Sequence, residues 1–237
     1  SDLTTTVGDL KLDADIDNAE DTSDALVLGS GITLSTTSAT GNITLDATEG
    51  SISSVGGVSI LSLANIDVND SLTTAGTTII TADSDASGTG DLTLATSMTI
   101  DTQNSTATIT ANEIILDGSL TTGTGALNLL VSDGGAIGFG DADKDYDLSK
   151  AELSRIISGA TQIGDVTSGS ITVDNVEAAD SNGILGMLTL DATGNSSNIV
   201  FETLASAFNS LTAKADDGIN LSVDLTTDMG DMILEAD

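Results

Sequence analysis

Proline, cysteine, histidine and tryptophan are all absent from this chain of 237 residues. Without cysteine and histidine, the usual pairs of nucleophile and base that enzymes employ are missing. The aromatic residues are limited to Phe139, Tyr146, Phe201 and Phe208, so any core must be filled mainly by Val, Ile, Leu and Ala. Such a composition suits stacked narrow turns better than a sandwich of two sheets, which usually buries at least one large aromatic side chain.

Basic residues are also scarce, with 5 Lys and Arg against 37 Asp and Glu, for a net charge of −32. This balance excludes binding to nucleic acid or to an anionic membrane surface. Repulsion on this scale has to be offset by cations or high salt, so divalent cations are expected partners. The sequence has no run of 18 apolar residues, and no membrane insertion is expected.

Catalysis is disfavoured, and we predict that the chain is not an enzyme. Polysaccharide lyases with a solenoid fold need clustered basic groups to abstract a proton, and the few Lys and Arg here are scattered along the sequence. Asp216 and Asp217 are an alternative acid and base pair for a glycosidase. A surface turn ahead of Gly218 explains these two residues equally well.

One short motif recurs through the chain: a glycine, a small or polar residue, and then an apolar-x-apolar step. Each copy has the period-2 pattern of a short strand with one buried face. The copies begin at Gly8, Gly41, Gly90, Gly125, Gly169, Gly186 and Gly230. Weaker strands of the same kind lie at 58–68, 107–116 and 218–225, so the whole sequence has the periodicity of a solenoid.

The most economical architecture for this pattern is an all-β parallel β-helix, with an antiparallel β-sandwich as the rival fold. Turns of roughly 20 residues stacked about 4.8 Å apart predict about twelve turns and a rod about 55 Å long. We expect 1–237 to be a single solenoid segment and an interior fragment of a longer chain, because a solenoid without caps exposes its core. The predicted inward residues are Leu10, Leu12, Ile43, Leu45, Leu92, Leu94, Leu127, Leu129, Ile171, Val173, Leu188 and Leu190.

One short helix is predicted near 149–158, where Ser149 and Glu152 form an S-x-x-E capping box and Gly159 ends the element. An acidic stretch precedes it, and residues 141–158 together form an expected insertion in the solenoid. Its side chains match positions 1, 3, 5, 7, 9 and 12 of an EF-hand loop and predict a calcium site. The candidate metal ligands are Asp141, Asp143, Asp145, Asp147, Ser149 and Glu152.

The match to the calcium loop departs from the pattern at one position. Tyr146 stands where the loop needs a glycine for its sharp turn, and no helix precedes Asp141. The alternative interpretation is a solvated acidic loop ahead of a capped helix.

Three segments carry a family resemblance: GNITLDATEGSI at 41–52, ANEIILDGSLTTGTGALNLL at 111–130, and the segment at 146–173. They resemble repeats of very large bacterial surface proteins of the filamentous-haemagglutinin type. The resemblance implies a right-handed parallel β-helix, secretion through an outer-membrane partner, and a role in adhesion, biofilm or the cell envelope. It implies no catalytic residue.

These observations lead to a functional hypothesis: a structural or adhesive segment of a large extracellular or cell-surface protein. Its expected partners are cations, extracellular polysaccharide or neighbouring cell-surface proteins, with lateral or end-to-end self-association. Two alternatives stay open. One is a surface-layer or sheath subunit whose rods pack through divalent bridges, and the other is a β-helical enzyme that degrades polysaccharide.

Overall fold

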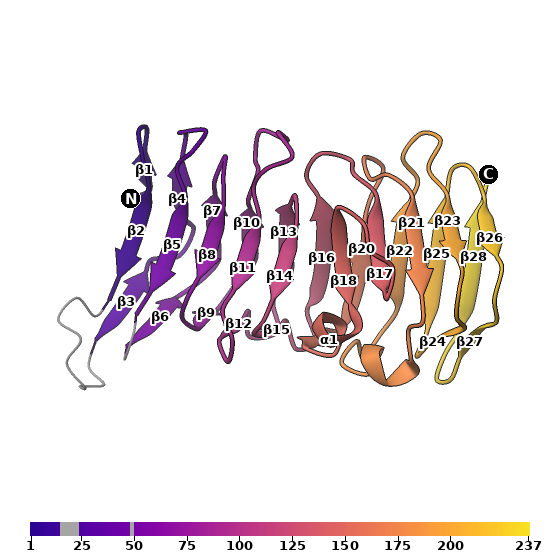
Figure 1. Cartoon of the computed structure of the whole chain (residues 1–237). Coiled ribbons are helices and arrows are strands. Elements are labelled where there is room, and N and C mark those ends of the chain that lie inside the picture. The colour runs from indigo at the N-terminus through magenta and orange to yellow at the C-terminus, as the bar shows by residue number, and fades with distance from the viewer. Residues whose placement is uncertain (15–23, 48–49) are drawn as a thin grey trace.

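The computed structural model describes residues 1–14, 24–47 and 50–237, and it is a rod of stacked rungs that runs from the N-terminus to the C-terminus (Figure 1). Every strand pairing within these ranges is parallel, and consecutive rungs pair in order along the rod. The predicted parallel β-helix is therefore confirmed, and the rival antiparallel sandwich is wrong. Each rung passes through up to three faces, which enclose one continuous apolar core.

The first face is an uninterrupted ten-stranded sheet within the described ranges. Its strands, in spatial order, are β1 (Leu3–Thr5), β4 (Ile32–Thr36), β7 (Val58–Leu61), β10 (Thr78–Thr81), β13 (Ala107–Ala111), β16 (Ala126–Val131), β20 (Ala160–Ile163), β22 (Leu188–Ala192), β25 (Leu211–Ala215) and β28 (Met232–Ala236).

The second face consists of two five-stranded sheets in the part of the chain that the structure describes. The first of them contains β2 (Leu10–Asp13), β5 (Ile43–Asp46), β8 (Ile66–Val68), β11 (Leu92–Leu94) and β14 (Ile114–Leu116). The other contains, in spatial order, β18 (Tyr146–Ser149), β17 (Ile137–Gly140), β21 (Ile171–Asp174), β23 (Ile199–Phe201) and β26 (Ile219–Leu221).

The third face is shorter and less regular. It contains β3 (Ala25–Leu28), β6 (Ser51–Ser54), β9 (Leu72–Thr74), β12 (Thr99–Asp101), β15 (Ser119–Thr121) and β19 (Ile156–Ile157), followed by a separate pair, β24 (Ser206–Phe208) and β27 (Leu225–Thr227). Two short helices, α1 (Lys150–Leu153) and η1 (Ala178–Ser181), lie beside it and contact each other. The sequence pattern predicted α1 but not the 3₁₀ helix η1.

In-register stacking places like side chains above one another in the core. On the first face one inward column has no exposed surface from β4 to β22. It contains Leu34, Ile60, Ile80, Ile109, Leu129, Ile163 and Leu190. Full burial of one such side chain stabilises the fold by roughly 1.5–3 kcal/mol.

The predicted inward set is confirmed, since all of its members are buried except Leu12, which is partly buried against the core. The repeated motif serves two different faces, however. The copies at Gly8, Gly41 and Gly90 lead into the second face, whereas that at Gly125 leads into the first. This alternation explains the irregular separation between the copies.

Three sequence expectations need correction. The first face has ten strands in the described ranges instead of the roughly twelve turns expected, because loops such as 82–91 lengthen the rungs beyond about 20 residues. Each weaker strand predicted at 58–68, 107–116 and 218–225 is bent at a corner into two shorter strands. The helix predicted near 149–158 ends at Leu153, because Ile156 turns inward and pairs with Leu120 in the third face.

Leu94 tests this register. Its side chain has no exposed surface, and Leu94→Asp should destabilise the fold by several kcal/mol because it buries an unpaired charge. The matched control is Thr108→Asp, which places the same side chain on the outer surface of β13 between Ile79 and Asn128 and should melt close to the parent. Urea and thermal melts of both variants check the register, which a parent-like melt of Leu94→Asp would refute.

Candidate functional site

The second face carries one strand more than the first at the middle of the rod. Between the rung of β13 and that of β20, the first face has β16 alone. Between β14 and β21 on the second face lie both β18 and β17, and β17 pairs with β18 on one side and β21 on the other. We call the junction between β14 and β18 the seam, because the sheets on its two sides are not joined by ladder hydrogen bonds.

Elsewhere on this face, the backbone N–H at the start of each strand donates to the next rung, as Ile66 does to the Asp91 carbonyl at 2.9 Å and Leu92 to the Glu113 carbonyl at 2.9 Å. Ile114, the next residue in this series, donates to Oε1 of Glu113 at 2.9 Å. The backbone N–H of Asp147 on β18 reaches Oε2 of the same carboxylate at 3.1 Å. The Glu113 carboxylate therefore bridges the two strands.

Glu152 forms a second bridge across the seam. Its Oε1 accepts from the backbone N–H of Leu116 at 3.0 Å, and its Oε2 accepts from that of Ser149 at 3.0 Å. The Leu116 carbonyl accepts from the Arg155 guanidinium. Three side chains thus replace the backbone ladder, which satisfies polar groups whose loss would cost about 1–3 kcal/mol each when buried.

A ladder of Asp and Asn side chains leads up to the seam along one corner of the rod. The backbone N–H of Asn42 donates to Asp9 Oδ1 at 2.9 Å, that of Asn65 to Asn42 Oδ1 at 3.2 Å, and that of Asp91 to Asn65 Oδ1 at 3.0 Å. The strand register places Glu113 next in this column. Its longer side chain reaches β18 across the seam, where the ladder ends.

Burial dominates the electrostatics of the seam. Burial, together with the nearby charges of Asp147 and Glu152, raises the pKa of Glu113 to about 8. The hydrogen bonds from the Ile114 and Asp147 amides lower this pKa but are a weaker influence than burial. The pKa of Asp147 is also raised, mainly by burial and then by Glu152 and Asp143. Tyr146 is fully buried, and its hydroxyl has no hydrogen-bond partner among the described residues. Burial followed by the two Glu charges raises its pKa as well.

The acidic loop that follows β17 folds back over the outside of that strand. Gly138 and Gly140 lie at outward positions yet are buried, because the loop and the neighbouring rung cover them. A Cβ on Gly138 would lie 2.3 Å from the Ala142 carbonyl oxygen, and one on Gly140 would lie 2.1 Å from that of Asp174. Glycine at both positions therefore lets the chain reverse and insert β18.

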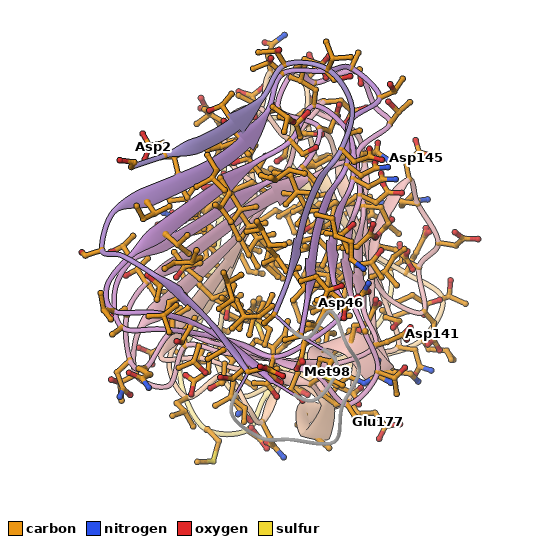
Figure 2. All side chains as sticks on the ribbon, turned by 90° about the vertical axis from the view of Figure 1, so that its left-hand side faces the viewer. Asp2, Asp46, Met98, Asp141, Asp145 and Glu177 are labelled. Carbon is orange, nitrogen blue, oxygen red and sulfur yellow. The ribbon has the colours of Figure 1, made fainter. Side chains whose placement is uncertain are left out.

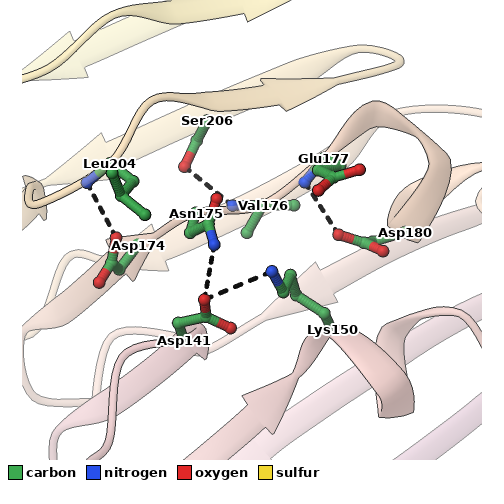
Figure 3. Close-up of polar contacts among 9 residues, drawn as sticks. All are labelled: Asp141, Lys150, Asp174, Asn175, Val176, Glu177, Asp180, Leu204 and Ser206. Atoms are coloured by element: carbon green, nitrogen blue, oxygen red, sulfur yellow. Dashed lines mark hydrogen bonds and ion pairs between the residues drawn. The ribbon is translucent and has the colours of Figure 1, made fainter.

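Asp141, at the start of this loop, is held by side chains from two other elements (Figure 3). Its Oδ2 lies 3.3 Å from Nζ of Lys150 on α1 and accepts from Nδ2 of Asn175 at 2.6 Å. The Asn175 hydrogen bond and then Lys150 lower the pKa of this carboxyl against the opposing effect of burial. These contacts tie the loop to the corner that follows β21.

The structure separates the six predicted calcium ligands into groups with different surroundings. Asp141 forms an ion pair with Lys150. Glu152 accepts a hydrogen bond from Leu116 across the seam and also forms the predicted capping box with Ser149, which is confirmed. Asp143 and Asp145 are exposed, and Asp147 is half-buried. Within the described residues, no group of three or more acidic side chains is arranged to hold a metal ion. Calcium binding here stays a prediction.

Asp216 and Asp217, the alternative glycosidase pair, lie in a turn far along the chain from the acidic loop. Asp216 accepts a hydrogen bond through Oδ2 from the Ser196 backbone N–H at 2.7 Å, and the backbone N–H of Asp217 donates to the Ser197 carbonyl at 2.8 Å. Both residues lie in the turn between β25 and β26, ahead of Gly218 with its left-handed φ of 99°. The surface-turn interpretation accounts for both contacts.

Comparisons with protein-family models, curated proteins and solved structures return no match. The resemblance to haemagglutinin-type surface repeats therefore remains a prediction. Among the described residues, no helix is long and apolar enough to cross a membrane.

Sequence reasoning missed Glu113, which contacts both sides of the seam. A signal was present: Glu113 occupies the place before an apolar-x-apolar step where Asp9, Asn42 and Asp91 precede the corresponding steps. Glu replaces Asp or Asn at this place, and its longer side chain marks the rung at which the corner ladder ends.

Glu113 gives the seam a predictable pH dependence. Its folded pKa of about 8 lies above the ordinary 4.5, so its stabilising contribution is complete below about pH 4.5 and is lost as the pH rises through about 8. Glu113→Gln removes the titration but keeps only one of the two acceptor oxygens. The variant should therefore be less stable than the parent near pH 5, and this deficit should shrink as the pH rises to near 9. Urea unfolding across this range measures the difference.

The control for this experiment is Glu202→Gln, which removes an exposed carboxylate from the same face. It should keep the parent's pH dependence apart from a small change in overall repulsion. Parallel stability curves for Glu113→Gln and the parent would contradict the assignment of a raised pKa to Glu113.

Proposed function

We propose that this chain is a structural segment of a large extracellular bacterial surface or filament protein, in which the rod serves as a spacer stabilised by cations. The continuity of the first face supports this proposal, since its strands pair without a break from β1 to β28 and the apolar core follows them. In such a stack each rung is stabilised by its neighbours. A rod of this kind holds the segments at its two ends apart.

The acidic outer surface of the second face supports the role of cations. Acidic residues recur at outward positions along this face: Asp13, Asp46, Asp67, Asp147, Asp174 and Glu202. In the end-on view, Asp141 and Asp145 lie on the side opposite Asp2 (Figure 2). Near the N-terminus, Lys11 bridges Asp13 and Asp46 at 3.0 and 3.3 Å. Rungs about 4.8 Å apart place such charges well within one screening length of each other.

The first test of the proposal is thermal melting in salt. Between about 0.01 and 1 M NaCl the screening length falls from about 30 to about 3 Å, so the melting temperature should rise by about 2–4 °C for each kcal/mol of repulsion removed. Calcium at equal ionic strength should raise it further by mass action. A melting temperature that does not change with salt would contradict a cation-stabilised rod.

The same melts, repeated with calorimetry, locate the calcium effect. Asp143→Asn with Asp145→Asn removes two exposed acids from the predicted loop, and Asp228→Asn with Asp231→Asn removes two exposed acids from a distant turn. A site in the loop predicts that the first pair alone loses the calcium increment. Equal losses in both pairs would show that calcium binds diffusely and that the six-residue loop is not its site.

The second test addresses the enzyme alternative. Incubation of the protein with neutral and acidic polysaccharides should release no reducing ends and no unsaturated products, because Asp216 and the Asp217 backbone are occupied in turn contacts. Product release that disappears in Asp216→Asn would contradict the structural role and establish catalysis. Release that persists in this variant would equally contradict the proposal and place the chemistry elsewhere.

A further inference from the structure

The charges of this protein are distributed unevenly around the rod. In the first face, strands β1, β4, β7, β10, β13, β16 and β20 contain no charged residue. We call their outer surface the neutral face. Its outward positions carry hydroxyl, amide and aliphatic side chains such as Thr33, Ser59, Ile79, Thr108, Asn128 and Gln162. A net charge of −32 makes an uncharged surface of this extent unexpected.

The corner between the third and first faces extends the neutral face. The connecting segments at 29–31, 55–57, 75–77, 102–106 and 122–125 also contain no charged residue. Large apolar side chains are exposed in this region, among them Val55 at 66% and Ile79 at 39%. The rod therefore has an acidic side, on the second face, and a side with exposed apolar groups and few charges. The exception is Asp2 at the N-terminal end, which accepts a hydrogen bond from the Thr33 backbone N–H at 3.0 Å.

The uneven distribution of charge favours one face of the rod for contact between two copies of the chain. Contact through the second face would bring rows of carboxylates together, and contact between neutral faces keeps these rows apart. Sheets pack face to face about 10 Å apart through interdigitating side chains, and the outward side chains of parallel strands form regular rows that allow such packing.

The size of the neutral face is enough for a weak specific contact. The seven strands contain three to six residues each. At about 4.8 Å between strands and about 3.3 Å per residue they give a flat area of roughly 34 by 15 Å. Pairing two such surfaces would bury about 1,000 Å² in total, which is at the lower limit for a biological interface. A polysaccharide fits the surface less well, because the aromatic rings Phe139, Tyr146, Phe201 and Phe208 are all buried and none is available for stacking on a sugar.

We propose that the neutral face binds the neutral face of a second copy of this chain and forms a reversible side-by-side dimer. This inference goes beyond the spacer function and does not require bound calcium. Residual repulsion between the acidic sides weakens the dimer, and salt therefore strengthens it. Divalent bridging between acidic faces would instead require the divalent ion.

Sedimentation equilibrium tests the proposal on the whole chain, from about 10 μM to about 1 mM protein, with a chelator present and at low and high NaCl. The parent should dimerise with a dissociation constant in this range, more tightly at high salt. Ser59→Asp with Asn128→Asp adds two charges to outward positions of β7 and β16 and should weaken the association at least tenfold.

The matched control adds the same two charges on the second face. Thr93→Asp with Asn220→Asp alters outward positions of β11 and β26 and should dimerise like the parent at high salt. Thermal melts of all three proteins confirm that they are folded, and if Ser59→Asp with Asn128→Asp unfolds, Asn128→Asp alone replaces it, with Asn220→Asp alone as its control.

Three results would overturn the proposal. The first is a parent protein that stays monomeric at high salt throughout the concentration range. A monomeric parent that binds a neutral polysaccharide through the neutral face would also overturn it. The second is equal loss of association in the two double variants. The third is association that appears only when a divalent cation replaces the chelator, which would assign the contact to the acidic faces.

Discussion

The parallel backbone ladder between successive rungs determines where each side chain of the rod lies. Because the N–H groups that begin each strand donate to the next rung, as Ile43 does to the Asn65 carbonyl at 3.0 Å, each strand is fixed in register above its neighbour. This register places inward residues in apolar columns, corner residues in a ladder of Asp and Asn, and outward residues in rows such as Thr44 beside Asp67. The acidic and neutral sides of the rod both follow from this repetition.

The seam shows how the ladder tolerates an irregularity. An additional strand on one face cannot be matched on the other two, so β14 and β18 meet without backbone pairing. Glu113, Glu152 and Arg155 supply the missing acceptors and donor. The aromatic residues of the chain are buried at this level or beyond it, and Phe139 and Phe208 lie 6.1 Å apart between ring centroids. The acidic loop is needed to reverse the chain, and part of its charge is engaged by Lys150.

Much of the fold could be predicted from the sequence, because period-2 patterning after a glycine reports the burial of each strand directly. That pattern alone predicts that Leu94 and Ile171 point inward, and both are fully buried. The rung length could not be predicted, since one motif serves two faces and the loops vary. The seam was also missed, because Glu113 and Glu152 are separated in sequence and converge only when β18 is inserted. The capping box at Ser149 was correct, but local spacing could not show that Glu152 also bonds Leu116 across the seam.

The rod is one continuous stack if the side chains of the seam preserve pairing between the sheets on its two sides. Native-state hydrogen exchange at individual backbone amides measures this continuity. We expect the amides of Leu116, Asp147 and Ser149 to exchange as slowly as ladder amides in the rungs on either side, and both halves of the rod to lose protection together as denaturant is added. Fast exchange at these three amides, with the rungs before and after the seam opening independently, would contradict it.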